Sequence, residues 1–525
     1  MIPFNRPNSP LRAAIQAALF GGLACAATSS AFADAFQAGN LIISSTYYAG
    51  DASTVSIGQA LPGGGTAIAN GAFPQVFTNE TPDASFGVTS PIVLQQMTTS
   101  GTVISQLNID SSQITTSFAS KSELALNIST DGKSVSFMGY AAPKNTLDVS
   151  NSNTAAVKDV SNPVQSTYAR AIANVNLGTG NLQVTNVNAY SGNNGRAAVL
   201  ANGNYYLVGN AGNSGKSVSA ATLNQLSANT GVQMIAQGAS GNTTVIGNGP
   251  TAHPTATTGG QYGFDVAQLG GAADKTGKDD NFRGMTIHDG TLYVTKGSGS
   301  NGVNTVYQVG ATGALNNGGS VAANSAITIL PGFSTTLASA AASASSTHPF
   351  GIWFGDDTHL FVADEGDGVR YGQTSTQKFT QQAGLQEWVL ANGVWSESAV
   401  FQKGLLDQAS YTGGLPWNVF TDGLRNLSGQ KNADGSFSIY ATTSTVSDEQ
   451  THDLGADPNQ IVSITIGADS TASNTAFTVL SQAVAGQRYG GVAIAPPSAV
   501  PVPSALWLFG SGLLGMLGLR RRKAH

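Results

Sequence analysis

The sequence predicts an all-β protein in which one hairpin unit recurs along the chain. Short runs of Val, Ile, Tyr, Phe and Thr are separated by Gly, Asn and Asp, which is the pattern of strands joined by tight turns. The 525 residues include 64 glycines, and only 10% of them are charged. Little of the chain between its two ends has the 3.6-residue period of an amphipathic helix. Helices are therefore expected only at the two ends.

The recurring unit is an apolar strand, a turn, and a second strand that ends in aromatic and β-branched residues. Its best copies are Gly284–Gly297 and Phe350–Gly366. Looser copies span Leu124–Tyr140, Gly195–Asn210 and Leu424–Thr443. Most turns contain Asp-Gly or Asn-Gly, which supplies the positive φ of a tight hairpin.

A second kind of hairpin lies between these copies, for example at Ile172–Val187, Val306–Gly319 and Leu385–Phe401. Two hairpins per repeat make a four-stranded sheet, and such sheets repeated around an axis make a β-propeller. We therefore predict a propeller of six or seven four-stranded blades over residues 34–494. A pair of β-sandwiches is the alternative architecture.

Two lone strands and two long insertions complete this domain. The first strand, Asn40–Gly50, and the last, Tyr489–Pro496, both lack partners nearby in the sequence. Together they are expected to close one blade from both termini and so remove the exposed edge of the ring. A Gly/Asn/Ser-rich stretch near 210–260 and an Ala/Ser tract at 335–347 predict insertions without a packing face.

Residues 1–33 have the features of a secretory signal peptide. A positively charged region with two arginines precedes an apolar region, which is expected to be helical. Ala31 and Ala33 then form a small-x-small cleavage site. This segment predicts export through the Sec translocon. Cleavage after Ala33 removes the only cysteine, Cys25, so the mature chain would have no thiol chemistry.

The last 26 residues combine three features in order. A proline motif, Val500-Pro501-Val502-Pro503, follows a short linker that begins at residue 495. An apolar run then predicts a helix of about 22 Å, which is marginal for a hydrocarbon core of about 30 Å. The membrane segment contains Ala505, Leu506, Trp507, Leu508, Phe509, Leu513, Leu514, Leu517 and Leu519, and the basic anchor consists of Arg520, Arg521, Arg522 and Lys523. Such an anchor is expected to stay at the cytoplasmic face.

This tail resembles the PEP-CTERM sorting domain of Gram-negative bacteria. In that family a Pro-Glu-Pro-like motif, a short membrane helix and a terminal Arg cluster are recognised by an exosortase. Here Val502 stands where the family has glutamate. The resemblance implies a precursor held transiently at the inner membrane, cleaved near the proline motif, and then sorted to the cell surface or the extracellular matrix. The family is associated with exopolysaccharide and biofilm production. A plain C-terminal membrane anchor is the alternative.

The charge of the chain argues against nucleic acid as a partner. The precursor has 23 basic and 29 acidic residues, a net charge of −6. Both terminal signals together contain six basic and no acidic residues, so the mature domain carries a net charge of −12. Such a domain repels polyanions.

A calcium site is a second expectation. The phrase His348–Glu365 resembles the blades of NHL- and SMP-30-like propellers, and enzymes of that kind often hold calcium in the central channel. Calcium prefers oxygen ligands, which two acidic stretches offer. The candidate ligands are Asp364 and Asp367 in one stretch and Asp448, Glu449, Asp453 and Asp457 in the other. The second stretch lacks the D-x-[DN]-x-[DN]-G spacing of a calcium loop, so a solvated acidic loop is favoured there over a metal site.

No motif of a nucleophilic or zinc hydrolase occurs in the sequence, and no catalytic residue is assigned. His288 and His348 occupy similar places in two repeats and could face a common channel with Arg283 and Asp364. Four tryptophans could stack on sugars or fill the core between blades. These are Trp353, Trp388, Trp395 and Trp417.

We therefore expect a non-catalytic propeller with a structural, adhesive or exopolysaccharide-associated role. The alternative is a secreted calcium-dependent hydrolase that acts on lactones, esters or glycans.

Overall fold

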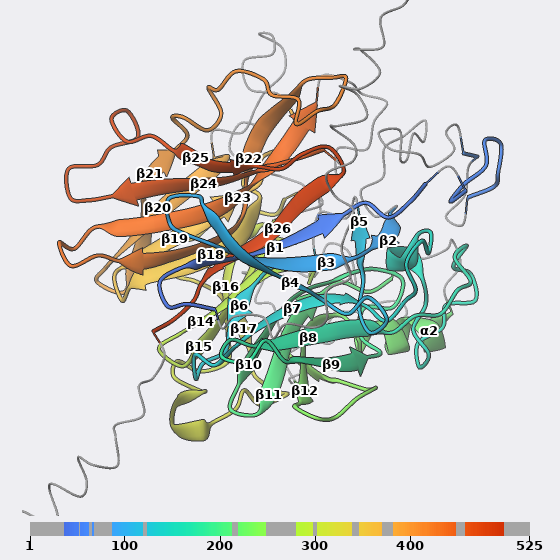
Figure 1. Ribbon diagram of the computed structural model, residues 1–525. Helices are drawn as coiled ribbons and strands as arrows, with labels where there is room; N and C mark the ends of the chain where they lie inside the picture. The colour runs from blue at the N-terminus through green and yellow to red at the C-terminus, as the bar shows by residue number, and fades with distance from the viewer. Residues whose placement is uncertain are drawn as a thin grey trace, which may run out of the picture.

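Figure 1 shows the computed structural model of the chain, and nearly all the regular structure of its described residues is β-strand. The structure describes residues 36–51, 53–61, 66–67, 87–118, 123–212, 219–247, 280–297, 302–338, 346–369, 382–447 and 457–497. The predicted signal peptide with Ala31 and Ala33, the tail from Val500 to Lys523, and the candidate ligands Asp448, Glu449 and Asp453 lie outside these residues. Within the described residues, no helix is long and apolar enough to span a membrane.

Six four-stranded antiparallel sheets form the blades of a propeller, which confirms the predicted fold class. Counted from the axis outward, the first blade contains β26 (Gln487–Ile494), β1 (Leu41–Tyr47), β3 (Ile92–Met97) and β4 (Val103–Asn108). The second contains β6 (Asn127–Ile128), β7 (Ser134–Tyr140), β8 (Arg170–Asn176) and β9 (Leu182–Val187). The third contains β10 (Gly195–Ala201), β11 (Asn204–Gly209), β12 (Gly231–Ala236) and β13 (Thr244–Ile246).

The other three blades follow in chain order. The fourth contains β14 (Phe282–His288), β15 (Thr291–Lys296), β16 (Thr305–Val309) and β17 (Ile327–Ile329). The fifth contains β18 (Pro349–Asp356), β19 (His359–Asp364), β20 (Gly384–Ala391) and β21 (Val394–Phe401). The sixth contains β22 (Val419–Lys431), β23 (Phe437–Ser447), β24 (Gln460–Ile466) and β25 (Thr478–Gln482). Outside the blades lie a two-stranded sheet of β2 (Val88–Ser90) and β5 (Thr116–Phe118), the helix α2 (Ala220–Ser227), and the 3-10 turns η1 (Val149–Asn151) and η2 (Asn316–Gly318).

The ring is closed by strands from both ends of the chain, as the sequence predicts. β26 pairs with β1 from Leu41↔Ile494 to Tyr47↔Gln487, with one irregularity between Ser44 and Ser45. The other edge of β1 pairs with β3. Figure 1 shows the blue β1 beside the red β26. One blade therefore takes its innermost strand from the C-terminal part and its other three from the N-terminal part, so neither terminal strand leaves an open inner edge.

The hairpin turns that the sequence singled out connect the first and second strands of their blades. Asn202-Gly203 and Asp289-Gly290 have positive φ at both positions, of 49° and 76° and of 42° and 66°. This backbone is the one that a two-residue hairpin turn needs, and it explains the Asn-Gly and Asp-Gly pairs.

The hydrophobic core is divided into six large clusters, one at each interface between neighbouring blades. In one of them Tyr206 of β11 packs with Phe282 and Tyr307 of the next blade. In another, Phe361 and Phe401 pack with Phe437 of the next blade. Apolar side chains on both faces of each sheet are therefore buried by two neighbours, which is how a propeller forms a core without a central hydrophobic plug.

Glycines let the innermost strands approach one another around the axis. A Cβ atom at Gly351 would lie 2.5 Å from the carbonyl oxygen of Arg425 on the next innermost strand. A Cβ at Gly284 would collide with the carbonyl oxygen of Phe350, and one at Gly491 with that of Leu124. The close packing at the axis thus depends on the missing side chains at these positions.

We expect Gly491→Ala to lower the thermal unfolding midpoint, because the added methyl group must push β26 away from the backbone of Leu124 and Leu126. Overpacking of this kind costs about 1–3 kcal/mol. Gly467→Ala is the matched control, since its nearest atom would be Ser436 Cβ at 3.6 Å. Equal midpoints for the two variants, measured by circular dichroism, would contradict the role assigned to Gly491.

Candidate functional site

The two faces of the ring differ in the chain segments that they present. Each innermost strand begins at one face, which we call the mouth face, and ends at the other, the opposite face. Because neighbouring strands are antiparallel, every second strand of a blade runs back and ends at the mouth face. Residues at the starts of β10, β14 and β18 and those directly after β19 therefore gather on the mouth face.

Three arginines from three blades converge at this mouth. Arg196 is near the start of β10 and Arg283 near the start of β14, and Arg425 on β22 lies level with Phe350 at the start of β18. We call Arg196, Arg283 and Arg425 the arginine cluster. Arg196 Nη1 donates to the carbonyl oxygen of Phe282 at 3.0 Å and to the side-chain oxygen of Asn281, which ties the first arginine to the strand that carries the second.

Glu365 and Phe350 hold two of these arginines in place. Arg425 Nε donates to Glu365 Oε2 at 3.2 Å, and Arg283 Nη2 lies 4.0 Å from Glu365 Oε1. The guanidinium carbons of Arg283 and Arg425 lie 5.7 and 5.9 Å from the centre of the fully buried Phe350 ring. Glu365 and the side chain of Arg283 remain 14% and 13% exposed, so the cluster reaches solvent at the mouth.

Burial makes this concentration of charge costly. Burial lowers the pKa of Arg196, and the nearby charge of Arg283 lowers that pKa further. The carboxylates of Glu123 and Glu365 raise the pKa and so oppose the shift. Burial also lowers the pKa of Arg283. Glu365 opposes this shift, and the charge of Arg425 adds to it. Arginine nevertheless keeps its proton in proteins at neutral pH. The described interactions therefore couple the three arginines to the carboxylates of Glu123 and Glu365.

Asp364, a predicted metal ligand, uses its carboxylate inside the fold. Its Oδ2 accepts from Thr347 Oγ1 at 2.8 Å, from the backbone N–H of His348 at 2.6 Å and from Gln386 Nε2 at 3.1 Å. Its Oδ1 accepts from the backbone N–H of Gly366 at 3.0 Å. Burial raises the pKa of Asp364, and these hydrogen bonds oppose that shift. This carboxylate thus ties the entry of β18 to the end of β19.

The other described candidates are placed apart from it. Asp367 accepts from the backbone N–H of Val369 at 2.9 Å, and Asp457 accepts from Trp417 Nε1 at 3.0 Å. In the part of the chain that the structure describes, no three His, Cys, Asp or Glu side chains group closely enough to hold a metal ion. With Asp448, Glu449 and Asp453 outside that part, the calcium site stays a prediction from the sequence.

The structure separates the two histidines that the sequence placed in one channel. His288 Nε2 lies 3.0 Å from Asp357 Oδ1, and its ring stacks on Phe354 with centres 4.4 Å apart. It ends β14 at the opposite face, whereas Arg283 begins that strand at the mouth face. His348, in contrast, lies directly beside Asp364 through its backbone N–H.

Three of the four tryptophans pack between blades. Trp353 stacks on Phe361 at 5.7 Å, and Trp388 stacks on Phe333 at 3.9 Å. Trp395, which is 7% exposed, meets Phe354 edge-on at 5.8 Å. These rings contribute apolar contact area between the blades.

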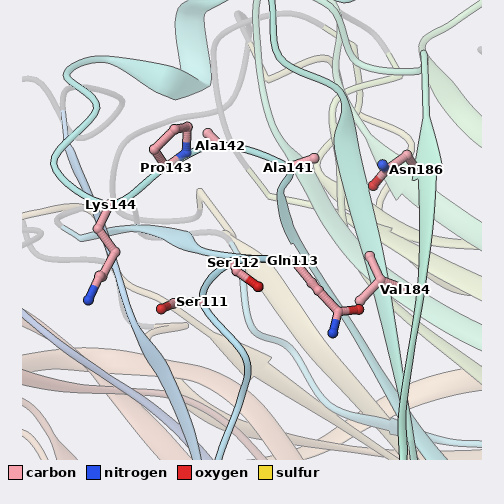
Figure 2. A pocket seen from close by; sticks show the side chains of 9 residues that line it. All are labelled: Ser111, Ser112, Gln113, Ala141, Ala142, Pro143, Lys144, Val184 and Asn186. Atoms are coloured by element: carbon pink, nitrogen blue, oxygen red, sulfur yellow. The ribbon is translucent and has the colours of Figure 1, made fainter.

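A groove of about 670 Å³ opens between the first and second blades (Figure 2). Figure 2 shows Val184 and Asn186 of β9 on one side, Pro143 and Lys144 on the other, and Gln113 between them. Its full lining is Ser111, Ser112, Gln113, Ala141, Ala142, Pro143, Lys144, Val184 and Asn186. The segment after β7 and the link from β4 to β5 both lie at the mouth face, so the groove opens on that face as well.

The groove is lined by hydrogen-bonding groups and contains no aromatic ring. Asp110 fixes one wall, because its carboxylate accepts from Ser112 Oγ at 2.7 Å and from Gln113 Nε2 at 2.9 Å. Hydrogen bonds from Gln113 and Ser112 lower the pKa of Asp110. The exposed ammonium group of Lys144 is the one cationic side chain of the lining. Such a lining suits a neutral, hydroxyl-rich ligand that is bound by hydrogen bonds.

Comparison with known families accounts for the C-terminal end of the chain. Residues 499–523 match the family described as the PEP-CTERM protein-sorting motif. The tail carries a sorting signal. This motif implies a secreted, membrane-anchored precursor that an exosortase processes and that is sorted to the surface. Comparison with curated proteins gives no match.

Comparison with solved structures gives only distant similarity. A structure described as "Phage phi92 endosialidase" is 11% identical, with a TM-score of 0.23, and the match covers 75% of this chain and 46% of that one. A structure described as "Crystal structure of an ACO/RPE65 chimera" is 8% identical, with a TM-score of 0.21, and covers 77% of this chain and 59% of that one. The chain thus matches less than two thirds of the length of either structure.

Sequence reasoning missed Arg196 and Arg425, although a signal for them was present. In the repeats, Gly195-Arg196-Ala197, Phe282-Arg283-Gly284 and Leu424-Arg425-Asn426 place arginine at the same position of the innermost strand, before a small or short side chain. Aligning the repeats by this position predicts convergence at the axis.

We expect Asp364→Ala to lower the free energy of unfolding, because each buried donor left without an acceptor costs about 1–3 kcal/mol. Asp469→Ala, at an exposed position, should change it by less than about 0.5 kcal/mol. The loss of stability caused by Asp364→Ala, measured by thermal unfolding, should be the same in EDTA and in excess calcium. A calcium-dependent rise in the wild-type midpoint that Asp364→Ala abolishes would instead identify this residue as a metal ligand.

Proposed function

We propose that the protein is an exported, non-catalytic propeller that associates with exopolysaccharide at the cell surface or in the matrix. The observation that carries this proposal is the sorting motif at residues 499–523, joined to a closed six-bladed ring. The signal peptide at residues 1–33 and Sec-dependent export belong to the same proposal.

The position of the chain end supports a defined orientation at the membrane. β26 ends at Ile494, and the backbone N–H of Ala495 donates to the carbonyl oxygen of Asn40 at 2.9 Å, just before β1 begins. Pro496 lies against Gly132, in the turn between β6 and β7 at the opposite face. The chain therefore leaves the ring at the opposite face. A precursor anchored by its tail would turn the mouth face and the groove away from the membrane.

Two properties of the mature domain favour a glycan as the ligand. Its groove presents amide and ammonium groups of Gln113, Asn186 and Lys144 and the hydroxyl oxygen of Ser112 as an acceptor. Its net charge of −12 disfavours polyanions in general, so the ligand of the groove is expected to be largely neutral. A ring with its binding face outward and its attachment point at the opposite face suits a matrix-associated protein.

For sorting, we expect the protein at the cell surface to end near the proline motif Val500–Pro503, as measured by mass spectrometry of its C-terminal peptide. In cells that lack the exosortase, the intact tail should remain in the membrane fraction. Replacement of Arg520, Arg521, Arg522 and Lys523 by glutamine should have the same effect. A mature protein that reaches the surface with Arg520–Lys523 still attached would overturn processing, and a cytosolic protein would overturn export.

For glycan association, we expect the double substitution Lys144→Ala and Asn186→Ala to weaken binding to exopolysaccharide purified from the producing cells about tenfold. Each lost hydrogen bond contributes about 0.5–1.5 kcal/mol, and 1.4 kcal/mol is a factor of ten. Co-sedimentation with the purified polymer measures the effect.

Lys133→Ala is the control, because Lys133 is an exposed lysine in the turn after β6, at the opposite face. Equal losses in the two variants would point to non-specific charge attraction and not to the groove. Undiminished binding by the double variant would remove the groove from the proposal.

A further inference from the structure

We propose that the groove of Figure 2 selects glycans that carry an acetamido group, that is, N-acetylated neutral sugars. This inference rests on the proposed association with exopolysaccharide and names the chemical group that the groove recognises. The groove volume of about 670 Å³ lies within the range of about 300–1,000 Å³ of small-molecule sites, so a sugar residue can enter with its substituent. Three properties of the lining support the proposal: an aliphatic surface, an oriented acceptor and two different donors.

The apolar part of the groove is aliphatic. Val184 of β9 and Ala141, directly after β7, pack against the core cluster between the first and second blades and stay partly exposed in the groove. Ala142 and Pro143 add further aliphatic carbons to the lining. None of the nine lining residues has an aromatic ring on which the face of a sugar could stack. Small aliphatic side chains instead suit a methyl group, whose burial strengthens binding about fourfold.

Gln113 offers an acceptor whose orientation is set by the fold. Its Nε2 donates to Asp110 Oδ2 at 2.9 Å, and its backbone N–H donates to the carbonyl oxygen of Asp110 at 3.0 Å. The amide nitrogen is therefore turned to Asp110, and the carboxamide oxygen lies on the side of Val184 in Figure 2. In a trans amide the N–H and the methyl group of an acetamido substituent lie on the same side, which matches an acceptor beside an aliphatic surface.

The carbonyl oxygen of an acetamido group needs a donor, and the groove has two. Asn186 of β9 and Lys144 lie on opposite sides of the groove in Figure 2, and both are exposed. Within the described residues, neither the carboxamide of Asn186 nor the ammonium group of Lys144 makes a hydrogen bond. Both groups can therefore donate to a ligand without giving up an internal contact.

The combination of these contacts distinguishes one substituent from another. A sugar hydroxyl can donate to Gln113 or accept from Asn186, but it has no methyl group for the aliphatic surface. An amino sugar without its acetyl group carries an ammonium, which offers the donors no acceptor and meets the like charge of Lys144. Of these three substituents, the acetamido group is the one that meets every part of the lining.

The test is isothermal titration calorimetry of the exported protein, purified from the cell surface, with three tetrasaccharides. They share one backbone and one linkage and differ in a single substituent of each sugar: acetamido in tetra-N-acetylchitotetraose, amino in its deacetylated form, and hydroxyl in cellotetraose. We expect saturable binding of the acetylated ligand, at least about tenfold tighter than that of cellotetraose, from the buried methyl group and the amide hydrogen bonds. The deacetylated ligand should bind no more tightly than cellotetraose.

Val184→Thr exchanges one methyl group for a hydroxyl and should weaken the acetylated ligand about fourfold while leaving cellotetraose unchanged. Val394→Thr is the matched control, because Val394 is exposed on β21 of the fifth blade, and it should change neither affinity. The ratio of the two affinities is measured on one preparation of each variant, so a fraction of misfolded protein does not produce the expected split.

Equal affinity for the three tetrasaccharides, tighter binding of the deacetylated ligand, or no saturable binding of the acetylated one would overturn the acetamido preference. The proposed function would survive that result if the exopolysaccharide still co-sedimented and the double variant of Lys144 and Asn186 still weakened it. Conversely, selective binding of the acetylated ligand that Val184→Thr weakens would support the preference even if the purified exopolysaccharide did not bind.

Discussion

The pairing of β26 with β1 is the contact on which the rest of the structure depends. Without β26, the first blade would lack its innermost strand, and β1 would present unpaired N–H and C=O groups along one edge. The pairing also fixes direction. Because β26 runs from the mouth face to the opposite face like every other innermost strand, the last described residues lie opposite the arginine cluster and the groove. Closure therefore fixes both the innermost edge of the first blade and the face at which the described chain ends.

Close approach at the axis has an electrostatic consequence. Gly284 and Gly351 allow the innermost strands to pack backbone against backbone, so the side chains beside them, Arg283 and Phe350, are drawn toward one another. An ion pair buried in this way recovers its desolvation cost only if further partners satisfy both groups. Glu365 supplies one such partner for both Arg283 and Arg425, and the ring of Phe350 lies against both guanidinium groups. The pairing is thus a property of the ring, because its members come from three blades.

The sequence predicts the fold well because hairpins are local. Asn202-Gly203 and Asp289-Gly290 carry their turn geometry in two residues, and the two lone strands at the ends imply one another as partners. The sequence predicts six or seven blades and does not decide between them, because insertions disturb the spacing of the repeats. The sequence pattern also gave no indication of β2 and β5, which pair across a long segment and belong to no blade. Short strands with distant partners leave little periodic signal.

The candidate sites were harder to predict because they depend on which way neighbouring side chains point. Asp364, Glu365 and Asp367 form one acidic stretch in the sequence, yet each has a different environment. Asp364 ends a strand and turns into the fold to meet four donors, whereas Glu365 turns to the axis and meets arginines. Asp367 lies in the following turn and bonds to its own backbone segment. Side chains alternate along a strand and diverge where it ends, so adjacency in sequence is a poor guide there.

The arginines show the opposite case. They are distant in the sequence, yet they occupy the same position in their repeats and lie close together in the fold. In a ring of blades, the same position of each innermost strand returns to the axis, so residues that recur there are brought together in space although they are far apart in the chain. Arg196, Arg283 and Arg425 thus come from three blades, and Glu365 affects the first and pairs with the other two. The burial of these charges and the choice of their partners are therefore set by the closed ring, and the spacing of the arginines along the chain does not show them.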